Sequence, residues 1–274
     1  MNRRRRFMLT SLAATAALAP ALALALPAGA AQARAHPMTG VNYVALGDSY
    51  ASGLGAGDYS DGNCDESANA FSVLWANANH PASFANETCS GATTQTVISS
   101  QLSPLSSSTT LVSIVIGGND VGFSNTLVTC VLDSTSACVS AIQTDESEMQ
   151  TQLPGEMDSV LSDIAADAPA AHVVVLGYPE LYDLSQSSSC IGLSTTDRTD
   201  LNQAADELDG QIQAAAARNG DSFGDVRSAF DGHQICDSSS WLHSVNFLDV
   251  AESYHPTASG QSGGYFPVFS SLAG

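Results

Sequence analysis

The sequence predicts an α/β fold in which helices cover both faces of a parallel sheet. Three runs, at 41–46, 111–116 and 172–177, are dominated by apolar and β-branched residues, which is typical of strands buried on both faces. Segments with apolar residues at helical spacing lie between them. Strands that alternate with helices in this way pair in parallel, and the connecting helices pack on both faces of the sheet.

The first 35 residues have the composition of an export signal that is removed. Arg3–Arg6 form a positive region, Ala and Leu dominate Leu9–Ala31, and Ala33–Ala35 supplies the small residues that a signal peptidase recognises. Twin-arginine and general secretory export both fit this pattern. Two prolines in the apolar stretch argue against a permanent membrane anchor. We therefore expect a cleaved signal peptide at 1–35, a single domain at 36–274 and an extracellular protein.

Cleavage leaves a strongly acidic chain. Three arginines and no lysine remain beside 28 acidic residues, which gives a net charge of −25 at pH 7. Such a surface repels nucleic acid phosphates and anionic lipid headgroups. We expect no nucleic acid partner, at most transient apolar contact with lipid surfaces, and a monomer.

Six cysteines in an exported chain indicate disulfides. The sequence contains no Cys-x-x-Cys pair, so neither a zinc site nor a redox dithiol is expected. Six cysteines allow fifteen pairings, of which the sequential one is the simplest. Cys130 and Cys138 bracket a loop short enough to close on itself.

The first predicted strand stops abruptly at Gly47-Asp48-Ser49. Ser49 then lies at the carboxyl end of a parallel strand, where open α/β sheets place their chemistry. The first turn of a following helix has free backbone N–H groups that can face a developing negative charge. The alternative is that Asp48 or Ser49 only caps that helix.

The chain then alternates between loops and regular elements. A helix is predicted at about 68–79 and a short strand at 82–85. The polar turn 88–94 follows, and its Gly91 would allow a substrate to approach the main chain closely. The strand at 111–116 ends in Gly-Gly-Asn-Asp, which is either a tight turn or a site where the Asn119 amide offers two N–H donors.

The second half of the chain is mainly helical by its pattern. Helices are predicted at 121–132 and 146–166, and Pro154 should kink or restart the second of them. A long amphipathic helix at 194–219 precedes a short last strand at 223–226.

A histidine in the C-terminal region completes a set of groups suited to acyl transfer. The irregular stretch 231–254 leads to His255, just before a last helix at 258–269. Acyl transfer requires a hydroxyl nucleophile, an imidazole that takes its proton, and donors around the oxyanion. The loops that carry these groups should all lie at the same edge of the sheet.

Four short motifs together resemble the conserved blocks of the SGNH (GDSL) hydrolase superfamily. They are GDSYASG from Gly47, Ser90-Gly91-Ala92, GGND from Gly117 and SYHP from Ser253. The chain is most similar to the secreted lipases, esterases and phospholipases A1 of actinomycetes. The resemblance implies a three-layer, flavodoxin-like fold with five parallel strands, and neither a metal nor an organic cofactor.

The resemblance also assigns roles to residues. It implies Ser49 as nucleophile and His255 as general base and acid. The backbone N–H groups of Ser49 and Gly91 and the Asn119 side chain would form the oxyanion hole. It further implies three disulfides, Cys64 with Cys89, Cys130 with Cys138, and Cys190 with Cys236.

The third catalytic group departs from the pattern of the superfamily. An Asp commonly lies three residues before the catalytic His, but here that residue is Glu252. Some actinomycete relatives instead use a backbone carbonyl two residues before the His, which here is that of Ser253. Because a Glu side chain is one methylene longer, we expect the Ser253 carbonyl to orient His255, with Glu252 as the alternative. A neutral carbonyl should leave the pKa of His255 near about 6.5.

The function that these observations predict is that of a secreted serine carboxylester hydrolase, a lipase or esterase or a phospholipase A1. Tyr50, Leu54 and Phe123 would lie beside the nucleophile and shape an acyl groove. The alternatives are a carbohydrate O-deacetylase on the same fold and a non-catalytic binding module.

Overall fold

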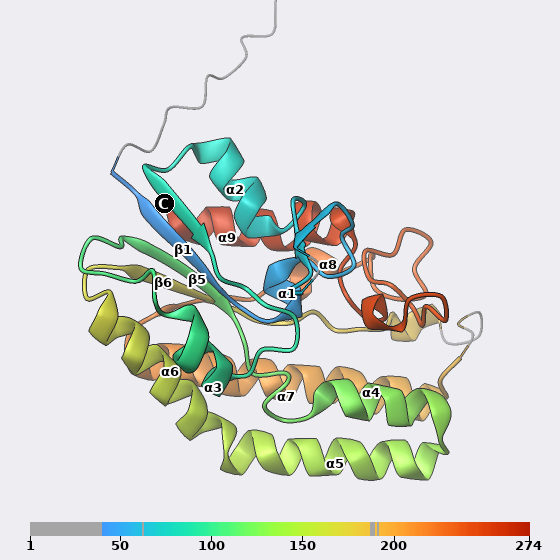
Figure 1. The fold of residues 1–274 in the computed structure, drawn as a ribbon. Helices are drawn as coiled ribbons and strands as arrows, with labels where there is room; N and C mark the ends of the chain where they lie inside the picture. The colour runs from blue at the N-terminus through green and yellow to red at the C-terminus, as the bar shows by residue number, and fades with distance from the viewer. Residues whose placement is uncertain (1–39, 62, 187–189, 191) are drawn as a thin grey trace, which may run out of the picture. The chain divides into compact units, whose positions relative to one another are not determined.

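The centre of the molecule is a parallel sheet with the strand order β4-β1-β5-β6-β7 (Figure 1). The computed structural model describes residues 40–61, 63–186, 190 and 192–274, so the predicted signal peptide at 1–35 lies outside the described residues. Within them, the sheet has five strands, β1 (Asn42–Gly47), β4 (Ser83–Asn86), β5 (Leu111–Val115), β6 (His172–Leu176) and β7 (Ser222–Gly224). The predicted strands and the flavodoxin-like architecture are therefore confirmed.

The middle strands are apolar because helices cover them on both sides. Every residue of β5 is buried, and β1 is buried from Tyr43 onward. In Figure 1, α2 and α9 lie over one face of the sheet, and α6 and α7 lie over the other. Burial of these apolar side chains is the main stabilising contribution, about 25 cal/mol for each Å² removed from water.

The helices follow the predicted order. They are α1 (Ser49–Ser52), α2 (Phe71–Asn79), α3 (Thr94–Thr96), α4 (Phe123–Leu132), α5 (Thr135–Thr151), α6 (Leu153–Asp167), α7 (Thr195–Asn219), α8 (Arg227–Phe230) and α9 (Phe266–Ala273). Two π-helical segments, η1 (Val97–Gln101) and η4 (Gly260–Tyr265), lead out of α3 and into α9, and η2 (Leu184–Gln186) and η3 (Val250–Glu252) are short 3-10 turns. Within the described ranges, no helix is both long and apolar enough to span a bilayer.

One helix boundary was predicted wrongly. The helix expected to begin at Glu146 begins at Thr135, as α5, where Ser134 caps it. The extra turns lack a strong apolar pattern, because small and polar residues surround the buried Cys138 and Ile142. Pro154 does restart the helix, since it lies in the first turn of α6.

A short antiparallel hairpin was not predicted. Its strands are β2 (Tyr59–Asp61) and β3 (Glu66–Ser67), in the loop after α1. Strands of two or three residues carry too little alternation to be recognised.

The disulfide pairing agrees with the sequential prediction. The bridges join Cys64 to Cys89, Cys130 to Cys138 and Cys190 to Cys236. None of them crosses between strands of the sheet. All three connect loops or helix ends.

Candidate active site

The backbone at the end of β1 turns sharply and presents Ser49 at the start of α1. Asp48 caps this helix, because its Oδ1 accepts the N–H of Tyr50 at 2.9 Å. Ser49 is 8% exposed, and its hydroxyl lies at the wall of a cavity. The capping interpretation therefore applies to Asp48, and the Ser49 hydroxyl stays available for the predicted catalytic role.

Only glycine fits at the residue that begins the turn. Gly47 has φ +130°, and a Cβ at this position would lie 2.3 Å from the Val115 carbonyl oxygen. A buried amide also fixes this residue: Gln101 Oε1 accepts the Gly47 N–H at 2.8 Å, and its Nε2 donates to the Gly47 carbonyl at 2.9 Å. Sequence analysis did not identify Gln101, because nothing in its local pattern marks a residue from η1 as a partner of β1.

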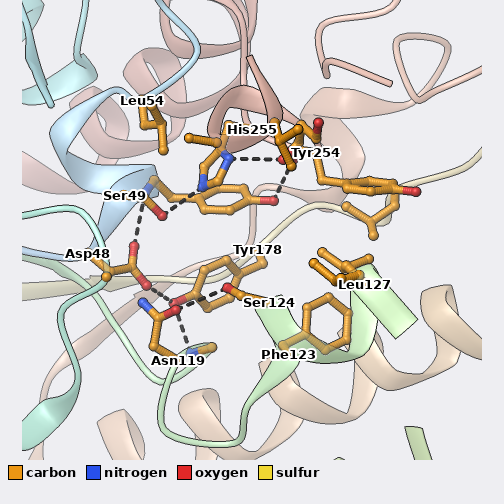
Figure 2. Close-up of a pocket in the computed structure, with 18 of the residues that line it drawn as sticks. Asp48, Ser49, Leu54, Asn119, Phe123, Ser124, Leu127, Tyr178, Tyr254 and His255 are labelled. Atoms are coloured by element: carbon orange, nitrogen blue, oxygen red, sulfur yellow. Dashed lines mark hydrogen bonds between the residues drawn. The ribbon is translucent and has the colours of Figure 1, made fainter. Parts of the chain in front are cut away.

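The predicted nucleophile and base lie within hydrogen-bond distance of each other. His255 Nε2 is 2.7 Å from Ser49 Oγ, and its Nδ1 is 3.0 Å from the Ser253 carbonyl oxygen (Figure 2). When Nδ1 carries the proton and donates it to this carbonyl, Nε2 is left free to accept the proton of Ser49. The Tyr254 backbone between them has φ +67°, and its carbonyl accepts the Tyr50 hydroxyl at 2.7 Å.

The Glu252 carboxylate has a different partner. Its Oε1 accepts the hydroxyl proton of Tyr59 at 2.7 Å, and the same hydroxyl accepts the N–H of Gly55 at 2.9 Å. No hydrogen bond between Glu252 and His255 side chains occurs among the described residues. The geometry thus favours the Ser253 carbonyl over Glu252 as the group that orients the imidazole.

The remaining predicted residues line the same cavity. Gly91 has φ +79°, which favours glycine, and within the described part of the chain no acceptor pairs with its N–H or with that of Ser49. Asn119 Nδ2 donates one hydrogen to the Ala92 carbonyl at 2.9 Å, and Oδ1 accepts the hydroxyl of Ser124 at 3.1 Å. The second Nδ2 hydrogen remains available for an oxyanion.

Tyr178, which sequence analysis did not identify, forms hydrogen bonds to the Ser49 turn and to the neighbouring turn. The Tyr178 hydroxyl donates to Asp48 Oδ2 at 2.5 Å and accepts the N–H of Gly118 at 3.1 Å (Figure 2). It thereby connects the Ser49 turn to the turn that carries Asn119. Burial raises the pKa of the Asp48 carboxyl to about 7, although the hydrogen bonds from Tyr178 and Tyr50 favour its ionised form.

Burial also changes the pKa of His255, which contradicts the expectation of an unshifted value. Desolvation lowers it to about 4, and the hydrogen bond from Nδ1 to the Ser253 carbonyl opposes this only in part. The Tyr50 ring, with its centroid 5.1 Å from that of the imidazole, contributes to the apolar surroundings. The lowered pKa could not be predicted from the sequence, because the burial of the imidazole depends on how the loops pack around it.

We expect the pH dependence of catalysis to reflect this low pKa. Because only the neutral imidazole accepts a proton, kcat/KM should be retained as the pH falls from 7 through 6.5, and should decline only as the pH approaches about 4. The measurement is the pH profile of hydrolysis of a soluble short-chain ester. Asp48→Asn is the control, since it removes the nearby buried carboxyl and should leave the acid inflection in place. An inflection at or above about 6.5 would contradict a buried, neutral His255.

The cavity beside Ser49 is mainly apolar. Its volume is about 520 Å³, and Leu54, Phe123 and Leu127 are among the side chains that line it, with Leu54 beside Ser49 in Figure 2. Tyr50 and Leu54 lie beside Ser49 as predicted, whereas Phe123 lines the same cavity farther from the nucleophile. Such a cavity can hold a hydrocarbon chain whose ester lies against Ser49. Among the described residues, no three His, Cys, Asp or Glu side chains are grouped so that they could hold a metal ion.

Comparison with known proteins identifies close relatives. Residues 45–262 match the GDSL-like Lipase/Acylhydrolase family. Lipase 1 of Streptomyces coelicolor is 53% identical over 272 residues, which cover 98% of this chain and 100% of that protein. The crystal structure of phospholipase A1 from Streptomyces albidoflavus superposes with a TM-score of 0.83 at 50% identity, over 85% of this chain and 100% of that one. The crystal structure of the extracellular lipase from Streptomyces rimosus superposes with a TM-score of 0.82 at 48% identity. The match covers 85% of this chain and 99% of that one.

Proposed function

Since the chain belongs to the GDSL-like lipase/acylhydrolase family and is a carboxylic ester hydrolase, we propose that it cleaves acyl esters outside the cell by way of a Ser49–His255 dyad. The observation that carries the assignment of residues is the 2.7 Å contact between Ser49 Oγ and His255 Nε2 at the wall of the apolar cavity. The leader-like composition of residues 1–35 and the likeness to an extracellular lipase support the location.

The first half of the reaction forms an acyl-enzyme. As Ser49 Oγ attacks the ester carbonyl carbon, His255 Nε2 takes its proton, and the carbonyl oxygen becomes an oxyanion. The N–H groups of Ser49 and Gly91 and the free Nδ2 hydrogen of Asn119 stabilise this charge. His255 then gives its proton to the departing alcohol, and the intermediate collapses to an ester of Ser49.

The second half repeats these steps with water. His255 Nε2 removes a proton from water, which attacks the acyl carbonyl, and returns it to Ser49 Oγ as the carboxylic acid leaves. During both halves the Ser253 carbonyl holds the imidazolium through Nδ1. A neutral carbonyl stabilises that cation less than a carboxylate would.

The apolar lining of the cavity supports a lipid-like acyl group as substrate. Leu54, Phe123 and Leu127 offer a hydrocarbon chain a place out of water, whereas a sugar would find few polar partners among them. For this reason we favour a lipase, esterase or phospholipase A1 over a carbohydrate O-deacetylase. The contact between Ser49 and His255 likewise favours an enzyme over a non-catalytic binding module.

Covalent labelling tests the proposed nucleophile directly. A serine-directed organophosphonate should inactivate the protein, and peptide mapping should find the label on Ser49. Titration of the acid released from triglyceride, phosphatidylcholine, simple esters and acetylated xylan would then assign the substrate class. Absence of labelling together with absence of ester hydrolysis would contradict the proposal.

The Ser253 carbonyl as orienting group gives a separate prediction. Glu252→Gln should change kcat/KM by less than about threefold, because its carboxylate contacts Tyr59 and the amide oxygen can still accept that hydroxyl. Steady-state kinetics on a soluble ester measures this. A loss approaching the factor of about 10⁴ that follows when a triad acid becomes an amide would make Glu252 the third catalytic group.

A further inference from the structure

Large apolar side chains are exposed around the mouth of the cavity. We call them the apolar rim, and they are Val128 and Leu132 of α4 and Phe247, Leu248 and Val250 of the segment before His255. Leu248 is 100% exposed, Phe247 79% and Leu132 72%. All of the rim except Leu248 also lines the cavity, so the rim is continuous with the site that holds the substrate. Apolar side chains exposed in one such group mark a surface that meets another apolar phase.

Hydrogen bonds hold the rim segment in shape. Asn246 Oδ1 accepts the backbone N–H groups of Leu248 at 3.0 Å and Asp249 at 3.2 Å, and the Asn246 N–H donates to the Ser253 hydroxyl at 2.9 Å. The part of the apolar rim that this segment contributes is therefore formed before any partner arrives, and binding requires little further ordering of the segment. The same segment carries Ser253, the residue whose carbonyl contacts His255.

The charges near the rim restrict the kind of surface that it can meet. Asp133 and Asp249, both exposed, flank the rim residues in the chain. Of the three arginines among the described residues, Arg198 is buried, Arg218 pairs with Asp158, and Arg227 pairs with aspartates that include Asp206. An anionic surface would be repelled, and a neutral one would not.

We propose that the apolar rim docks the molecule on the surface of neutral or zwitterionic lipid, with Leu248 and Phe247 inserted among the acyl chains. Docking in this orientation brings the mouth of the cavity against the lipid, so that an acyl chain passes into the cavity without crossing water. The inference rests on the proposed function, and it adds the surface through which the substrate is delivered.

Binding is measured first, in the Ser49→Ala background so that the lipid is not consumed. Sedimentation with phosphatidylcholine vesicles should show binding, and Leu248→Asp should weaken partitioning by about tenfold or more, since a buried leucine contributes about that much. Ala78→Asp adds the same charge at an exposed residue of α2, a helix that contributes to neither the rim nor the cavity lining, and should bind like its parent. In a Leu248→Trp variant, the tryptophan fluorescence should shift to the blue on mixing with the vesicles.

Activity is measured on protein that retains Ser49, and the comparison of a soluble with a dispersed ester separates docking from catalysis. Leu248 does not line the cavity, so Leu248→Asp should hydrolyse soluble p-nitrophenyl acetate like the wild type and lose about tenfold or more of its rate on dispersed phosphatidylcholine. Retained activity on the soluble ester also shows that the variant is folded. If the wild type fails on every ester, the proposed function fails, whatever the vesicles show.

Three results would overturn the docking proposal. The first is equal partitioning of the Leu248→Asp and parent proteins. The second is tighter binding to phosphatidylglycerol than to phosphatidylcholine vesicles, which would indicate a cationic docking surface. The third is a dimer in gel filtration that Leu248→Asp dissociates, because the rim would then be covered by a second copy of the chain.

Discussion

Ser49→Ala is expected to lower kcat/KM for any ester by about three powers of ten or more, with the fold unchanged. The substitution removes the hydroxyl that we propose as the nucleophile, while the His255 ring and the oxyanion donors stay in place. The Ser49 hydroxyl contacts His255, and the Ser49 carbonyl, which accepts the Gly53 N–H at 3.2 Å, is unaffected. Single-turnover kinetics on a soluble ester and thermal unfolding measure the two effects.

Ser262→Ala is the matched control for the loss of a hydroxyl. Ser262 is exposed in η4, and its hydroxyl donates to the Ser259 carbonyl of its own turn. We expect activity within a factor of about two of wild type, as for most surface substitutions. Turnover by Ser49→Ala near the wild-type rate would make the dyad assignment wrong.

Asn119→Ala is expected to lower kcat by about two to three powers of ten, roughly 3 to 4 kcal/mol of transition-state stabilisation. The Nδ2 group donates one hydrogen to the Ala92 carbonyl and offers the other to the oxyanion, so its removal takes away a donor and loosens the turn that carries Gly91. The amide is most strongly engaged when the negative charge develops, and KM should therefore change much less than kcat.

Ser124→Ala is the control for this variant. The hydroxyl of Ser124, an exposed residue, donates to Asn119 Oδ1 rather than to the Nδ2 group that faces the oxyanion. Loss of this hydroxyl should therefore cost little activity. If Asn119→Ala raises KM alone, Asn119 is a binding or turn-forming residue, and the oxyanion hole consists of backbone groups.

Local patterns in the sequence were enough to predict most of the fold and to select the principal candidate site residues. The runs at β1, β5 and β6 are apolar because they are buried on both faces, and the polar turns at their carboxyl ends are the places where Ser49 and Asn119 lie. His255 is separated from Ser49 by about two hundred residues, yet the order of strands and helices already implied that both lie at the same sheet edge.

What escaped prediction depends on contacts between distant segments. Gln101 and Tyr178 hold the backbone and the cap of the Ser49 turn, but neither belongs to a motif. Gln101 meets its partner because η1 contacts β1, and Tyr178 does so because the turn after β6 reaches the turn after β1. The low pKa of His255 has the same origin, since burial of the ring is a property of the assembled loops. The start of α5 was missed for a different reason, its weak apolar pattern.

The placement of the disulfides has a consequence for how the molecule loses function. Cys64–Cys89 ties the loop after α1 to the Gly91 turn, and Cys190–Cys236 joins the loop after β6 to the loop after α8. Cys130–Cys138 closes the turn beside the cavity wall at Leu132. The sheet itself depends on none of them. A reductant should therefore release the catalytic edge as a locally unfolding unit while the sheet remains intact, so that inactivation precedes global unfolding. We therefore expect the three bridges, rather than the stability of the sheet, to determine how long the protein remains active in a reducing medium.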